Sequence, residues 1–129
     1  MLDPRLENDS EYICHLASGQ LRMIKDGENE WFILVPEKEN CYEIIDLNEQ
    51  EQSKLLQDIN LVSHVLKKYT SLDKLNIGAL GNMVKQLHVH IIARYETDRA
   101  WPGAIWGTQS EKIFDASSVE VWRQRINNA

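Results

Sequence analysis

The first third of the chain alternates between apolar and polar positions in short runs that are typical of β-strands. Three such runs stand between turn-forming residues, at 11–18 (EYICHLAS), 20–26 (QLRMIKD) and 31–36 (WFILVP). Ser18-Gly19 supplies the first turn, and Gly27 with Asn29 supplies the second. Because strands this close in sequence pair antiparallel, we expect antiparallel neighbours, with the third strand ending at Pro36.

The apolar period then changes to that of a helix. Asn48 is a suitable N-cap, and Glu51 occupies the third helical position, as in a capping box. His64 lies off the apolar stripe and is expected to face solvent. The stripe itself recurs at helical spacing and consists of Leu55, Ile59, Val62, Leu66 and Tyr69.

Two further strands and a short helix are predicted in the second half of the chain. The strands are 74–80 (KLNIGAL) and 86–94 (QLHVHIIAR), and a turn-rich segment follows at 97–107. The last helix starts near Ser117, with Glu120 in capping-box position. The order β-β-β-α-β-β-α predicts an α+β fold, in which an antiparallel sheet of about five strands carries a long helix on one face. No repeat or linker interrupts the chain, so we expect one domain over residues 1–129.

Composition narrows the possible functions. A net charge of −6 argues against broad nucleic-acid binding, which needs basic surface. No apolar run approaches the roughly 20 residues of a membrane span, and residues 1–10 contain no apolar signal core. We therefore expect a cytoplasmic protein without membrane contact. The two cysteines, Cys14 and Cys41, have no metal-like spacing and are expected to be small buried hydrophobes.

The segment 86–94 contains two of the four histidines of the chain. On a strand, Gln86, His88 and His90 would project from one face because side chains alternate. The residues between them would project into the core against the helix; they are Leu87, Val89 and Ile91. This arrangement would hold the imidazoles in a fixed direction.

Three interpretations of the histidine row are open. A metal site is disfavoured, because zinc needs three or four protein ligands and no acidic residue stands at a matching offset. A pair of hydrogen-bonded histidines on a polar sheet face is the commonest role of such a motif. The third interpretation is covalent catalysis, because imidazole has an ordinary pKa of about 6.5 and is a nucleophile near neutral pH. Attack on phosphorus by His88 would give a phosphoramidate.

The motif QLHVHII at 86–92, its lead-in LNIGALGNMVK at 75–85 and the later Trp-Pro-Gly at 101–103 resemble the histidine triad (HIT) superfamily. The signature of that family is His-φ-His-φ-His-φ-φ, where φ is apolar. Residues 88–92 match the signature, whereas Gln86 stands where the first histidine is expected. The resemblance extends over roughly residues 20 to 107.

The resemblance implies nucleotide chemistry. Family members attack the α-phosphorus of a nucleoside phosphate with the middle histidine, which corresponds to His88. His90 matches the histidine that contacts phosphate oxygens. Gln86 cannot ionise and offers only neutral hydrogen bonds, so we expect an orienting role for it.

Three further site residues follow from the resemblance, and each also has an ordinary structural interpretation. Asn76 matches an asparagine that faces the site, although an asparagine near a strand edge also bonds backbone. Asn82 stands where members place a polar residue against the phosphate. Asp26 is a weaker candidate for binding the ribose hydroxyls, because such a residue beside Gly27 most often serves turn chemistry alone. Backbone N–H groups of the turn that contains Gly78 and Gly81 could hold an anion.

We therefore expect a HIT-like nucleotide hydrolase or nucleotidyl transferase that acts on a phosphoramidate or dinucleoside polyphosphate through a covalent nucleotidyl-histidine. The alternative is a nucleotide-binding protein with little or no turnover. No metal is needed for the nucleophile, although Mg²⁺ can accompany a polyphosphate substrate. A homodimer is expected, because residues 74–80 and the tryptophan-rich loop at 101–106 leave apolar surface.

Overall fold

The computed structural model describes all residues from Met1 to Ala129. Its elements are α1 (Pro4–Asp9), β1 (Ser10–His15), β2 (Gly19–Ile24), β3 (Trp31–Pro36), a 3₁₀ turn (Ile44–Asp46), α2 (Glu49–Tyr69), β4 (Lys74–Gly78), β5 (Val89–Arg94) and α3 (Ser118–Asn127). The strands form one antiparallel sheet in the order β1-β2-β3-β5-β4. The predicted α+β class and the five-stranded sheet are confirmed. None of the helices combines the length and the apolar character that crossing a bilayer requires.

The long helix α2 begins as the sequence predicts. The Asn48 side chain accepts a hydrogen bond from the Glu51 N–H, and the Glu51 side chain accepts one from the Asn48 N–H, both at 2.8 Å. This capping box satisfies two donors that a helix start leaves unpaired. The apolar stripe is confirmed in its centre, but Tyr69 at the end of the helix is 41% exposed. His64 is exposed, as predicted.

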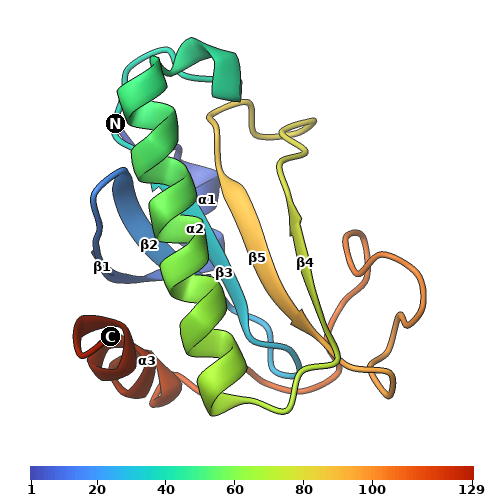
Figure 1. Cartoon of the computed structure of the whole chain (residues 1–129). Helices are drawn as coiled ribbons and strands as arrows, with labels where there is room; N and C mark the ends of the chain where they lie inside the picture. Colours follow the sequence, from blue (N-terminus) through green and yellow to red (C-terminus); the bar gives the residue numbers. More distant parts are fainter.

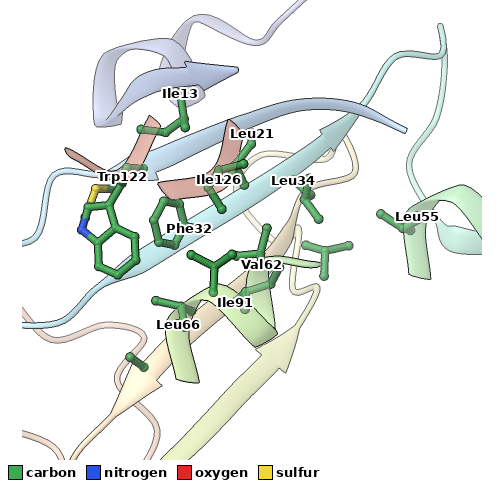
Figure 2. Packing of buried hydrophobic residues seen from close by; sticks show 14 of the residues in the cluster. Ile13, Leu21, Phe32, Leu34, Leu55, Val62, Leu66, Ile91, Trp122 and Ile126 are labelled. Atoms are coloured by element: carbon green, nitrogen blue, oxygen red, sulfur yellow. The ribbon is translucent and has the colours of Figure 1, made fainter. Parts of the chain in front are cut away.

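The main core lies between the sheet and α2. Phe32 and Leu34 of β3 and Ile91 of β5 face Val62 and Leu66 of the helix (Figure 2). All five side chains are fully buried. Their burial is the largest stabilising contribution of the fold, at roughly 1.5–3 kcal/mol for each such side chain. Helix α3 closes this core beside β1, where the Trp122 ring packs edge-on against Phe32.

The opposite face of the sheet is covered in part by α1, which the sequence analysis did not predict. α2 crosses one face of the sheet and α1 lies against the other (Figure 1). Asp3 caps α1 by accepting the Arg5 N–H, and Pro4 occupies the first turn, where its missing N–H costs nothing. With six residues and Leu6 as its one buried side chain, α1 has too little periodicity to be recognised.

The predicted capping box of the last helix is wrong. The Ser117 side chain caps no backbone N–H of α3, and its hydroxyl donates to Asp115 instead. Glu120 accepts hydrogen bonds from Arg123 and Gln124, so it does not reach back to the helix start. The helix itself is present, because Trp122 and Ile126 bury its apolar side.

The strand that carries the histidine motif is shorter than predicted. β5 begins at Val89, so Gln86 and His88 precede the strand and do not lie within it. The backbone leaves the sheet here because the Leu87 N–H donates to the Cys41 carbonyl and not to a neighbouring strand. The predicted alternation still holds for the apolar partners, since Leu87, Val89 and Ile91 all lie in the main core.

Candidate functional site

His88 and His90 lie side by side, with ring centroids 4.9 Å apart and ring planes inclined by 62°. Both are buried, at 8% and 7% exposure, whereas the strand pattern predicts histidines on a polar face of the sheet. The Trp106 ring covers His90 at a centroid distance of 5.5 Å. Trp106 lies over Gly78, the residue of β4 that pairs with His90, where an added Cβ would already contact the indole at 3.5 Å. A small residue at 78 therefore leaves room for this cover.

The surroundings of His88 fix its tautomer. Its Nδ1 lies 2.7 Å from the backbone carbonyl oxygen of Gln86. A carbonyl oxygen only accepts hydrogen bonds, so Nδ1 carries the proton. In the neutral ring, Nε2 then carries the free lone pair, which is the arrangement that a nucleophilic imidazole requires.

His90 has the opposite tautomer. The indole Nε1 of Trp31 lies 2.9 Å from His90 Nδ1, and an indole N–H only donates. Nδ1 of His90 is therefore the acceptor, and the neutral ring carries its proton on Nε2. Burial, with a smaller contribution from the charge of His88, lowers the pKa of His90 to about 4. His90 is thus a neutral hydrogen-bond donor at physiological pH.

Trp31 is not among the site residues that the sequence predicts. Alternation along β3 places residues 31 and 33 on the same face of the sheet, and Ile33 pairs with His90. That β3 lies next to β5, however, depends on pairing across 59 positions of sequence, which no local pattern encodes. An aromatic donor at the start of a buried strand was the one available signal.

The Gln86 side chain points away from both histidines. Its Oε1 accepts a hydrogen bond from the Asp3 N–H at 2.7 Å, and its Nε2 donates to the Met1 carbonyl at 3.2 Å. Only the backbone carbonyl of Gln86 contacts the histidine pair. The side chain therefore ties the start of the chain to the segment that precedes β5.

Asn76 and Asn82 occupy different environments. Asn76 lies on β4, and its Oδ1 accepts a hydrogen bond from Arg94 at 2.7 Å. Its amide nitrogen donates to no group of the chain and remains available. Asn82 is exposed in the loop between β4 and β5 and makes no hydrogen bond within the chain. Arg94 is almost fully buried and also binds Asp98 and the Gly103 carbonyl, so its guanidinium is committed.

The structure does not bring Asp26 into contact with the histidines. Its carboxylate pairs with Arg99 at 2.8 Å and accepts the N–H groups of Glu28 and Asn29. Burial alone would raise the pKa of Asp26, but these hydrogen bonds hold it below its ordinary value. Asp26 and Trp31 line the same cleft of about 720 Å³, which the segment 108–112 borders on its other side.

Metal-binding and redox groups are sparse. The structure contains no group of three or more side chains of histidine, cysteine, aspartate or glutamate that could hold a metal ion. Both cysteines are free thiols. Cys41 is buried in the main core as predicted, whereas Cys14 is only partly buried at its margin.

Comparison with known proteins identifies solved structures with the same fold. A histidine triad protein from Bradyrhizobium japonicum superposes with a TM-score of 0.92 and is 43% identical over 99% of this chain and 96% of that chain. A histidine triad protein from Sinorhizobium meliloti 1021 gives a TM-score of 0.92 and 41% identity, covering 99% of this chain and 95% of that chain. A histidine triad protein from Marinobacter aquaeolei VT8 gives a TM-score of 0.91 and 32% identity, covering 99% of this chain and 93% of that chain. No curated protein matches the chain. Residues 5–97 match the HIT domain family, and the chain therefore belongs to that family.

Proposed function

We propose that the chain is a nucleotide hydrolase or nucleotidyl transferase in which His88 attacks the α-phosphorus of a nucleoside phosphate derivative. The substrate would be of the phosphoramidate or dinucleoside polyphosphate type. The observation that carries the proposal is the pair of complementary tautomers, with a lone pair on Nε2 of His88 and a proton on Nε2 of His90. In this proposal, His88 attacks through Nε2, and the neighbouring His90 donates a hydrogen bond from Nε2.

The proposed reaction has two steps. In the first, Nε2 of His88 forms a bond to phosphorus, and the bond to the leaving group breaks with its electron pair. The positive charge that develops on the imidazole is shared through Nδ1–H with the Gln86 carbonyl, while Nε2–H of His90 donates to a phosphate oxygen. In the second step, water or another acceptor attacks phosphorus and releases His88.

The loop between β4 and β5 supports binding of an anion. None of the backbone N–H groups from Ala79 to Gln86 donates a hydrogen bond within the chain. Gly81 has a φ of +68°, a conformation that side chains disfavour and that is typical of turns whose successive backbone amides bind an anion. We propose that these amides, together with Asn82, hold the phosphate beside His88.

The cleft beside Trp31 is the proposed place for the nucleoside. Trp31 connects the cleft to His90, because this residue lines the cleft and its indole N–H donates to the His90 ring. Asp26 stays a candidate for binding the ribose hydroxyls, since its Oδ1 has a single partner and a carboxylate oxygen accepts more than one hydrogen bond. Any Mg²⁺ would arrive with a polyphosphate substrate.

Gln86 is proposed to occupy the first position of the triad. Its neutral amide adds no charge at the site. In this proposal two histidines and the backbone carbonyl of Gln86 suffice for turnover.

We further propose a homodimer that forms along β4. This strand is an edge of the sheet, so one side of its backbone is unpaired. Ile77 within the strand and Leu80 just after it are 47% and 46% exposed. Edge strands with apolar side chains are ready templates for pairing. A two-fold axis is the commonest solution.

Turnover of a fluorogenic adenosine phosphoramidate and of a dinucleoside polyphosphate tests the proposed function. The wild type should release the nucleotide, and His88→Ala should lose activity while keeping its circular dichroism spectrum. His64→Ala is the matched control, because His64 is exposed on α2, and it should keep the wild-type rate. Nucleotide binding without turnover in the wild type would instead identify a nucleotide-binding protein, and equal rates for His88→Ala and wild type would exclude His88 as the nucleophile.

A further inference from the structure

The first five residues cross the end of the loop that leads into the histidine pair. This N-terminal strap, Met1–Arg5, contacts the loop through three hydrogen bonds. Two of them join Gln86 to the backbone of Met1 and Asp3, and the third runs from Arg5 Nη1 to the Met83 carbonyl at 3.0 Å. Leu2 adds an apolar contact to the small cluster under α1. The strap is thus attached to the loop at both ends.

Gln86 connects the strap with His88 directly. Its side chain contacts the strap, and its backbone carbonyl accepts the Nδ1–H of His88 at 2.7 Å. A primary amide is suited to this place, because it offers an acceptor to the Asp3 N–H and a donor to the Met1 carbonyl at the same time. A carboxylate lacks the donor, and an apolar side chain lacks both.

The charges also show that the strap lies near the histidines. The pKa of the Asp3 carboxyl is held below its ordinary value, chiefly by hydrogen bonds from Arg5 and to a smaller extent by the charge of His88. The strap is therefore within electrostatic reach of the site, although no strap side chain contacts a histidine.

We infer that the N-terminal strap and Gln86 are positioning elements for His88: the strap holds the Gln86 amide, which fixes the carbonyl that keeps the proton of His88 on Nδ1 and its lone pair on Nε2. The inference rests on the proposed function, since it assigns these residues a part in the same reaction. It also gives the Gln86 amide a task that a carboxylate cannot perform in full, because a carboxylate has no donor. Releasing the strap lets the carbonyl move, so the fraction of His88 in the attacking tautomer falls.

Two variants release the strap in different ways. Gln86→Met keeps the length of the side chain and removes both hydrogen bonds to the strap. Asp3→Pro removes the N–H that donates to Gln86, and it fits the backbone because Asp3 has a φ of −58°, close to the value that proline imposes. Asp3→Ala is its matched control, since it loses the same carboxylate but retains the N–H.

The readouts are kcat and KM, together with the tautomer of His88 from ¹⁵N chemical shifts. We expect Gln86→Met to lower kcat by about tenfold with KM within about twofold, as for the loss of a positioning contact. The kcat of Asp3→Pro should be lower than that of Asp3→Ala by about fivefold or more. In both strap-released variants, the Nδ1–H form of His88 should give way to a mixture of tautomers. The double variant Gln86→Met/Asp3→Pro should be no slower than the slower single variant, because both changes break one connection.

The inference is overturned if Asp3→Pro and Asp3→Ala have the same kcat, or if the losses of kcat in Gln86→Met and Asp3→Pro multiply in the double variant. It is also overturned if Gln86→Met chiefly raises KM. An unchanged His88 tautomer in both variants overturns it as well. The NMR measurement needs no turnover. An inactive wild type would therefore refute the proposed function, whereas the His88 tautomer in the two variants would still decide whether the strap positions His88.

Discussion

The indole N–H of Trp31 donates to Nδ1 of His90 at 2.9 Å, across 59 positions of sequence, and this contact determines which nitrogen of His90 carries its proton. A hydrogen bond to the lone pair of an imidazole favours the neutral ring and opposes protonation. Burial acts in the same direction. Trp31 determines that the proton of neutral His90 lies on Nε2, and burial keeps the ring neutral at physiological pH.

Replacing Trp31 tests this relationship. Trp31→Phe keeps an aromatic ring on β3 and removes the donor, so we expect the neutral His90 ring to become a mixture of tautomers, while burial still holds its pKa below the ordinary value. We expect kcat near neutral pH to fall by about tenfold, because the donor on Nε2 is no longer fixed. The ¹⁵N chemical shifts of the His90 ring measure the tautomer. Trp101→Phe is the control, since Trp101 stacks near Arg94 and not on His90. An unchanged tautomer of His90 in Trp31→Phe would contradict the assignment.

The stability of the fold should depend on pH through the same residue. Above about pH 6.5, His90 is neutral in both the native and the unfolded chain. Between pH 6.5 and 4, the unfolded chain takes up a proton that native His90 does not, so the free energy of unfolding falls as the pH falls. The expected loss from this group is about 3 kcal/mol.

Urea unfolding of wild type and His90→Gln over this range measures the effect. The stability of His90→Gln should fall less between pH 6.5 and 4, whatever its stability at pH 7. Parallel curves for the two proteins would show that His90 titrates normally in the native state.

The elements that the sequence predicts are those with local signals. β3 and α2 were placed within a residue because a continuous apolar run and a capping box lie within the segments themselves. α1 has one buried residue and gave no such signal. The start of β5 was misplaced because a distant acceptor, the Cys41 carbonyl, removes Leu87 from the ladder.

The candidate site likewise contains residues that a local pattern predicts and contacts that only the fold determines. His88 and His90 were found from their spacing, but their tautomers depend on Gln86 and Trp31 through the fold. Asp26 pairs with Arg99 over 73 positions, and the Gln86 amide reaches Asp3 over 83. Such pairings arise from the topology of the sheet and leave no periodic trace in the sequence.

The buried ion pair of Arg94 and Asp98 should carry much of the stability at the end of the sheet near Trp31. The two side chains are 2% and 4% exposed and are joined at 2.7 Å. The hydrogen bond from Arg94 is the main reason that the pKa of Asp98 lies far below its ordinary range. Asp98→Asn leaves Arg94 buried without a counter-charge, and we expect the free energy of unfolding to fall by about 3–5 kcal/mol.

The exposed pair of Arg123 and Glu120 provides the comparison. Glu120→Gln should change stability by about 0.5 kcal/mol or less, as exposed ion pairs do. Equal effects of Asp98→Asn and Glu120→Gln in urea unfolding would show that the buried pair is not important for stability.

Light scattering tests the proposed dimer. The wild type should have twice the mass of one chain at micromolar concentration, and Ile77→Glu should halve it by placing a charge on the β4 edge. Ile45→Glu, at an exposed position of the 3₁₀ turn, should remain dimeric. A monomeric wild type, or an unaffected mass for Ile77→Glu, would refute pairing along β4.

The most direct test of the central claim is a search for the covalent intermediate. The protein is mixed with an adenosine phosphoramidate, quenched in base within milliseconds to seconds, digested and examined by mass spectrometry. We predict an acid-labile adenylyl group on the peptide that contains His88, present in wild type and absent from His88→Ala. Turnover without any adduct on His88, or an adduct that persists when His88 is replaced, would contradict nucleophilic catalysis by His88.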